Sequence, residues 1–123
     1  MTLQELLKLH DETHAKCRKV MEIKNNDYTG GKEATDIFAN FKSSQILGVH
    51  PVTGILMRII DKLQRIKTFA NDGMLSVPDE SVEDACEDIV NYAILAKAML
   101  LESRESLRKQ KIKREVEEIV KKG

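Results

Sequence analysis

The length, composition and charge of the chain favour one small helical unit. Its 123 residues suit a single core, because folded domains usually need about 100 to 150 residues to enclose one. The 20 Lys and Arg residues balance the 20 Asp and Glu residues, so the formal net charge of +0 argues against duplex DNA as a partner. Trp is absent and aromatic residues make up 4% of the chain, so aliphatic residues and Met must build the core, as in helical bundles.

The cysteines indicate a reducing compartment, and the apolar runs of the sequence are too short for a membrane-spanning helix. Cys17 and Cys86 form neither a CxxC metal motif nor a disulfide framework, so both are predicted to be reduced core thiols. No apolar run approaches the roughly 20 residues that a membrane-spanning helix needs. We therefore expect a cytoplasmic protein.

The first predicted helix begins with a capping box. Thr2 and Glu5 are three residues apart, the spacing at which each side chain satisfies a free backbone amide at a helix start. Apolar residues then recur at three- and four-residue steps, which places them on one face of an α-helix. Asn25 and the glycine pair at 30–31 predict the end of this helix.

Two further helices are predicted in the middle of the chain, at residues 32–45 and 51–70. Pro51 suits the first turn of the second of these, where its missing amide hydrogen costs nothing. The Asn-Asp-Gly sequence at 71–73 predicts its end. Its predicted buried stripe consists of Val52, Ile55, Leu56, Ile59, Leu63 and Ile66.

A long helix and a charged tail are predicted to follow. The helix spans residues 78–101, with an N-terminal cap formed by Ser76 and Asp79. Its predicted core face consists of Val82, Cys86, Ile89, Ala93, Ala96 and Leu100. The predicted fold is therefore all-α, a bundle of four to five helices, with a helical domain at 1–102 and a charged C-terminal helical tail at 103–123.

Acidic residues are crowded at the start of the long predicted helix. Six of the ten residues at 79–88 are acids, although like charges four residues apart repel on a helix. Glu80, Asp84 and Asp88 are spaced at i, i+4 and i+8, which would stack three carboxylates on one ridge. Carboxylate oxygens suit Mg²⁺ or Mn²⁺. The ridge is therefore either a divalent-metal site or a solvated acidic surface.

A mixed polar ridge lies on the predicted helix at 51–70. Arg58, Asp61, Lys62 and Arg65 are three and four residues apart, so they share one face. If these side chains faced the acidic ridge, they would form either structural salt bridges or a phosphate-binding wall, because arginine pairs with carboxylate and phosphate alike. The polar segment at 24–31 is either a helix end and turn or a loop that contacts a nucleotide.

The chain resembles the nucleotide modification associated domain, a family found largely in bacteriophages, over about residues 20–100. The resemblance lies in four strings, which are KNNDYTG at 24–30, DIFANF at 36–41, RIIDKLQR at 58–65 and DESVEDACEDIVNYAIL at 79–95. That family is similar to the all-α nucleoside triphosphate pyrophosphohydrolases of the MazG and dimeric dUTPase type. In those enzymes acids on two helices hold Mg²⁺, which binds the triphosphate and activates the attacking water.

The resemblance implies a role for each matching residue. The implied catalytic residues are Glu80, Asp84 and Asp88. The same three acids and Asp61 are the implied ligands of Mg²⁺, with Mn²⁺ as the other candidate ion. The implied nucleotide-binding residues are Lys24, Asp27, Tyr28, Arg58, Lys62, Arg65, Asn91 and Tyr92. The sequence departs from the hydrolase pattern because no ExxD motif follows its ExxE motif at 80–83.

The expected function is nucleotide binding, with MazG-like, Mg²⁺-dependent pyrophosphohydrolase activity in phage nucleotide metabolism or modification. One alternative is a noncatalytic sponge that sequesters a host signalling nucleotide. Another is a structural interaction module whose tail at 103–123 binds a partner helix. The resemblance also implies a homo-oligomer, dimeric or larger, and a place in the host cytoplasm if the gene belongs to a phage.

Overall fold

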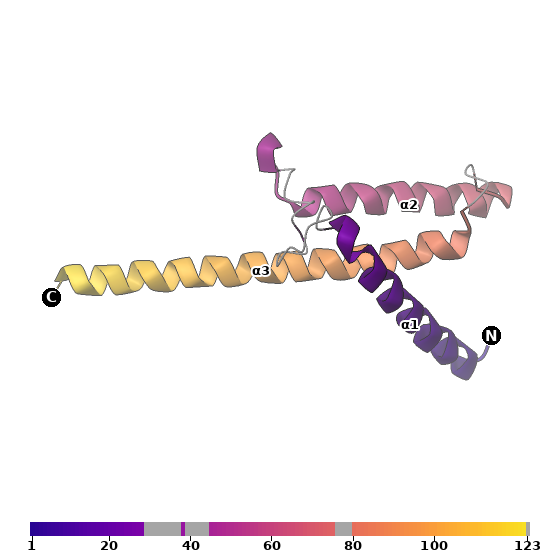
Figure 1. Cartoon of the computed structure of the whole chain (residues 1–123), viewed down its shortest axis with the longest axis horizontal. Coiled ribbons are helices and arrows are strands. Elements are labelled where there is room, and N and C mark those ends of the chain that lie inside the picture. Colours follow the sequence, from indigo (N-terminus) through magenta and orange to yellow (C-terminus); the bar gives the residue numbers. More distant parts are fainter. Residues whose placement is uncertain (29–37, 39–44, 76–79, 123) are drawn as a thin grey trace.

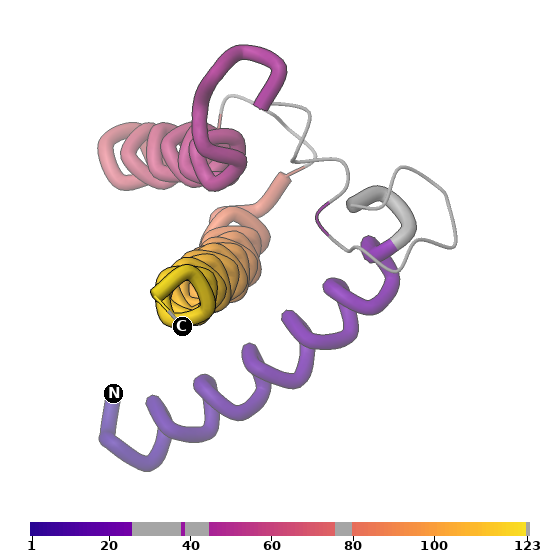
Figure 2. The backbone as a smooth tube through the Cα atoms, turned by 90° about the vertical axis from the view of Figure 1, so that its left-hand side faces the viewer, coloured from indigo at the N-terminus to yellow at the C-terminus, as the bar shows by residue number. Residues whose placement is uncertain are grey.

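An antiparallel pair of helices forms the centre of the fold. The structure, a computed structural model, describes residues 1–28, 38, 45–75 and 80–122. Within these residues it contains three helices and no strand, namely α1 (Leu3–Tyr28), α2 (Val52–Asp72) and α3 (Val82–Lys122). Helices α2 and α3 lie side by side, whereas α1 crosses α3 obliquely (Figure 1). Helix α3 lies between the other two (Figure 2).

The all-α prediction is confirmed for the described residues, which form three α-helices rather than the predicted four to five. The helix predicted at 78–101 and the tail predicted at 103–123 are one helix, because no Gly or Pro interrupts the sequence of α3. The helix predicted at 32–45 falls almost wholly outside the described residues. No helix in the described part of the chain is both long enough and apolar enough to cross a membrane.

Local sequence signals define the ends of α1 and α2. The amide of Thr2 donates to Glu5 Oε2 at 2.6 Å and the amide of Glu5 donates to Thr2 Oγ1 at 3.1 Å, which confirms the capping box. Helix α1 extends to Tyr28, between Asn25 and the glycine pair at 30–31, where its end is predicted. Helix α2 ends at Gly73, whose φ of 73° is left-handed and whose amide donates to the Phe69 carbonyl at 2.8 Å.

The start of α3 differs from the prediction in a way that matters for the acidic residues. Residues 80 and 81 are not helical, so the predicted start at 78 is wrong. Ser81 caps the helix instead, since its Oγ accepts from the amide of Asp84 at 3.0 Å and its own amide donates to Asp84 Oδ2 at 3.5 Å. Glu80 therefore precedes the helix and shares no helical ridge with Asp84 and Asp88.

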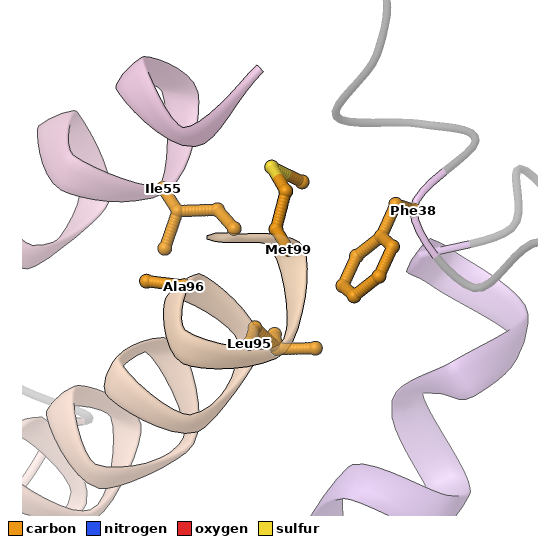
Figure 3. Packing of buried hydrophobic residues seen from close by; sticks show 5 residues of the cluster. All are labelled: Phe38, Ile55, Leu95, Ala96 and Met99. Carbon is orange, nitrogen blue, oxygen red and sulfur yellow. The ribbon is translucent and has the colours of Figure 1, made fainter. Parts of the chain in front are cut away.

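The hydrophobic core lies between α2 and α3. Ile55 of α2 is fully buried and belongs to one apolar cluster with Leu95, Ala96 and Met99 of α3 and with Phe38 (Figure 3). The face of α3 that enters this core is rotated from the predicted one. Of the residues predicted to be in the core, Cys86, Ala93 and Leu100 are exposed, and on α2 so are Leu56 and Leu63.

Candidate functional site

A cleft of about 370 Å³ opens between α1, α2 and the first turns of α3. Such a volume lies within the range of about 300 to 1,000 Å³ typical of small-molecule sites. Most of the side chains around it are charged. The lining residues are Lys16, Cys17, Val20, Lys24, Lys62, Glu80, Asp84, Glu87, Asp88 and Asn91.

Two buried side chains, Cys17 and Asn91, form hydrogen bonds between α1 and α3 at the floor of the cleft. The Cys17 thiol donates to the Glu87 carbonyl at 3.7 Å, and Asn91 Nδ2 donates to the Cys17 carbonyl at 3.0 Å. Asn91 is only 4% exposed, and its Oδ1 is buried without a hydrogen-bond partner among the described residues. An unsatisfied buried acceptor costs about 1 to 3 kcal/mol, and a cleft ligand would reach this one only after the Asn91 side chain moved, because the atom is buried.

Lys62 lies at the centre of the charge network. Its Nζ is 2.8 Å from Glu80 Oε1 and 2.9 Å from Asp88 Oδ2, and all three side chains are less than one fifth exposed. Arg65 also binds Glu80. Burial alone would lower the pKa of Lys62, but its hydrogen bonds to Glu80 and Asp88 outweigh burial and raise that pKa. Lys62 therefore carries its charge at neutral pH.

Helix α1 supplies two more ammonium groups from one face. Lys16 Nζ is 3.1 Å from Glu87 and 3.9 Å from Asp84, while Lys24 Nζ is 3.8 Å from Asp88. The hydrogen bond to Glu87 raises the pKa of Lys16. Lys16 and Lys24 are eight residues apart, which places them two turns apart on the same side of the helix.

The carboxylates of the cleft do not fit a metal ion in their present arrangement. Each one faces a lysine or arginine, and no group of three or more His, Cys, Asp or Glu side chains within the described ranges is placed to hold a metal. Asp84 is also engaged in capping α3. Asp61 is 60% exposed and binds Arg65 rather than the other acids. A metal ion could bind here only after the carboxylates released their cationic partners.

The structure divides the residues that the sequence analysis singled out into two groups. The cleft brings together Glu80, Asp84, Asp88, Lys24, Lys62 and Asn91, and Arg65 joins them through Glu80. Arg58, Asp61 and Tyr92 instead line a shallower hollow of about 340 Å³ with Met57 and Lys62. Lys62 is the side chain that the two sites share. The side chains of Asp27 and Tyr28 lie outside the described part of the chain.

Sequence reasoning missed four residues of the cleft, namely Lys16, Cys17, Val20 and Glu87. Lys16 carried a usable signal, because it lies two helical turns before the predicted Lys24 on the same face. Glu87 belonged to the acidic run but not to the ridge with i+4 spacing. The approach of Cys17 to α3 depends on how two distant helices cross, which no local pattern indicates.

The two cysteines are expected to differ in reactivity. Burial, followed by the nearby Glu87 and Asp88 carboxylates, raises the pKa of the Cys17 thiol, which keeps it protonated and poorly nucleophilic. Cys86 is exposed, so its predicted place in the core is wrong. We expect a soluble aromatic disulfide reagent to modify one thiol per native chain rapidly. The Cys86→Ser variant should lose this fast reaction, whereas rapid labelling of that variant would contradict the burial of Cys17.

The fold and the cleft define an all-α protein with a densely ion-paired site at the crossing of three helices. Residues 50–100 of the chain match the family model described as Nucleotide modification associated domain 1. The match covers α2 and the part of α3 that faces the cleft, but not α1. This part of the chain is thus similar to a domain associated with nucleotide modification. No curated protein and no solved structure matches the chain.

Proposed function

We propose that the cleft binds the phosphate groups of a nucleotide. The observation that carries this proposal is the convergence of Lys16, Lys24 and Lys62 from two helices on one cleft. Ammonium groups are effective partners for phosphate oxygens, and several of them around one cleft attract an anion more strongly than any one alone. The match to a nucleotide modification family over α2 and α3 supports a nucleotide as the source of the phosphate.

The ion pairs present in the cleft suggest how the nucleotide would enter. Each lysine is held by a carboxylate, so a bound phosphate must compete with Glu80, Glu87 or Asp88 for the same ammonium groups. A triphosphate has the advantage in this exchange, because its linked phosphates can engage several lysines at once. After a movement of the Asn91 side chain, its unused Oδ1 would then accept a hydrogen bond from an N–H or O–H group of the base or sugar.

A more specific proposal is that the protein also hydrolyses the bound nucleotide. It rests on the resemblance to the MazG-type pyrophosphohydrolases and on three carboxylates, Glu80, Asp84 and Asp88, that line the cleft. Bound Mg²⁺ would neutralise phosphate charge and activate a water molecule. The carboxylates are occupied by cationic side chains, so we derive no catalytic step from their positions.

Sequestration of a nucleotide without turnover is the second candidate function. It is favoured by the engagement of the cleft carboxylates in ion pairs and by their failure, among the described residues, to form a metal-binding group. A sponge of this kind needs the lysines and Asn91 but no metal. The two functions therefore share a binding site and differ in whether a product is released.

A nucleotide panel tests both functions. We expect at least one nucleoside triphosphate to raise the melting temperature, and Lys24→Met to weaken its binding about tenfold through loss of one phosphate contact. Lys19→Met is the matched control, because Lys19 is an exposed lysine of the same helix that does not line the cleft.

Pyrophosphate release in the presence of Mg²⁺ would identify the hydrolase, and a thermal shift without product would identify the sponge. Absence of any shift across the panel would contradict nucleotide binding.

A further inference from the structure

A groove between α2 and α3 lies apart from the charged cleft. Its volume is about 540 Å³, and it shares no lining residue with the cleft. On α3 the lining residues span 93–104, which corresponds to about 17 Å or about three helical turns. The lining consists of six apolar and two cationic residues, namely Leu56, Ile59, Ala93, Ala96, Lys97, Leu100, Leu101 and Arg104. The groove is therefore long enough and apolar enough to hold a short amphipathic helix.

The apolar residues of the groove are only partly covered by the chain itself. Leu56 of α2 and Leu100 and Leu101 of α3 are 47%, 51% and 43% exposed. Ala93 is exposed as well, and its small side chain allows a neighbouring helix to approach α3 closely. The side chains of a third helix would fill the spaces between those of α2 and α3, which removes apolar surface from water.

Two cations, Lys97 and Arg104, determine the charge of the groove. They are seven residues apart, which places them about two turns apart on the same side of α3. Neither has an ion-pair partner among the residues that the structure describes, whereas each lysine of the cleft faces a carboxylate. The described residues that line the groove include no acid. A partner that covers the groove must therefore supply carboxylates, because a cation that is covered without a partner is costly.

The same two cations distinguish among the occupants of such a groove. A second copy of this chain, paired through the same groove, would bring Lys97 and Arg104 close to their like, which is unfavourable. A nucleic-acid backbone would pair with the cations but would leave the six apolar lining residues without a fitting partner. A helix with an apolar stripe and carboxylates beside it matches both parts of the lining.

We propose that the groove binds an acidic amphipathic helix of a different protein. The apolar stripe of that helix would lie between α2 and α3, against Leu56, Leu100 and Leu101. Carboxylates seven residues apart on the partner helix would pair with Lys97 and Arg104. Because the groove and the cleft have separate linings, this inference does not depend on the proposed nucleotide binding.

Two synthetic peptides that differ only in charge test the proposal. Both are about 15 residues long, so that a helix can form, and both carry leucines at helical spacing along one face. One peptide has glutamates two turns apart beside the leucines, and the other has lysines at the same positions. Each is labelled with fluorescein and titrated with the full chain. Fluorescence anisotropy is expected to show that the glutamate peptide binds at least about tenfold more tightly than the lysine peptide.

Reversal of the two cations sharpens the test. The double variant Lys97→Glu and Arg104→Glu should reverse the preference, so that the lysine peptide binds more tightly. The double variant Lys109→Glu and Lys113→Glu is the matched control, because both lysines are exposed on the same helix and do not line the groove. The control should keep the preference for the glutamate peptide. Circular dichroism establishes that both variants retain their helices.

Several results would overturn the proposal. One is equal binding of the two peptides, or no binding of either, at micromolar concentration of the wild-type chain. Another is loss of the preference in the control variant, because the overall charge of α3 would then account for it. Tighter binding to vesicles of anionic phospholipid than to the glutamate peptide would assign the groove to a membrane surface. A wild-type dimer that dissociates on Leu100→Glu would assign it to a second copy of the chain.

Discussion

Replacement of Ile55 by alanine is expected to lower the free energy of unfolding by about 2 to 5 kcal/mol. Ile55 has no exposed surface and lies in the small core between α2 and α3 with Leu95, Ala96 and Met99 (Figure 3). Its truncation removes three carbon atoms and leaves a cavity that rigid helices close only partly. A domain of this size has roughly 5 to 15 kcal/mol of stability, so this single change removes a large share of it.

Ile60→Ala provides the matched control for this experiment. Ile60 lies on the same helix and is 49% exposed, so we expect the control to cost less than about 1 kcal/mol. Denaturant unfolding followed by circular dichroism measures both variants. Equal losses for the two substitutions would contradict the assignment of Ile55 to the core.

Replacement of Lys62 by methionine is the second change with a large expected effect. It removes the 2.8 Å contact of Glu80 and the 2.9 Å contact of Asp88, and the expected loss of stability is about 1 to 3 kcal/mol. The loss is smaller than for an isolated buried pair, because Arg65 still binds Glu80 and Lys24 still faces Asp88. Lys67→Met, an exposed lysine on the same helix, should change stability little.

The pH dependence of this loss has a defined sign. The pKa of Lys62 is raised in the folded state, so its stabilising effect is complete below the ordinary lysine value of 10.5 and is lost as the pH rises through the higher folded value. The difference in stability between wild type and Lys62→Met should therefore shrink at alkaline pH. A double-mutant cycle with Asp88→Asn should give a coupling energy of about 0.5 to 3 kcal/mol. A coupling near zero would contradict the Lys62–Asp88 contact.

Much of the helical structure could be predicted because helix ends are encoded locally. Thr2 and Glu5 mark the start of α1, and Pro51 and Gly73 frame α2, through hydrogen bonds that span only a few residues. The same reasoning predicts too early a start for α3, because Ser76 and Asp79 have the spacing of a cap, whereas Ser81 and Asp84 make the capping hydrogen bonds. The early predicted start places Glu80 on the same helical ridge as Asp84 and Asp88, whereas in the structure Glu80 precedes the helix.

The composition of the candidate site was less predictable than the helices. Spacing predicts a polar ridge that contains Lys62 and an acidic ridge that contains Asp88, and the structure pairs these two side chains. The contribution of Lys16 and Cys17 depends on where α1 crosses α3, which is a tertiary property. The exposed Ala93 and Leu100 illustrate the same limit, because spacing identifies an apolar face of α3 but not which side of the helix packs against α2.

Calorimetric titration of Lys62→Met with a nucleoside triphosphate tests the central claim most directly. The titrant is the nucleotide that gives wild type its largest thermal shift, and Lys67→Met is titrated in parallel. If phosphate displaces carboxylates from the lysines of the cleft, Lys62→Met should bind about 10 to 100-fold more weakly than wild type while Lys67→Met binds normally. Equal affinity of wild type and Lys62→Met would contradict binding in this cleft.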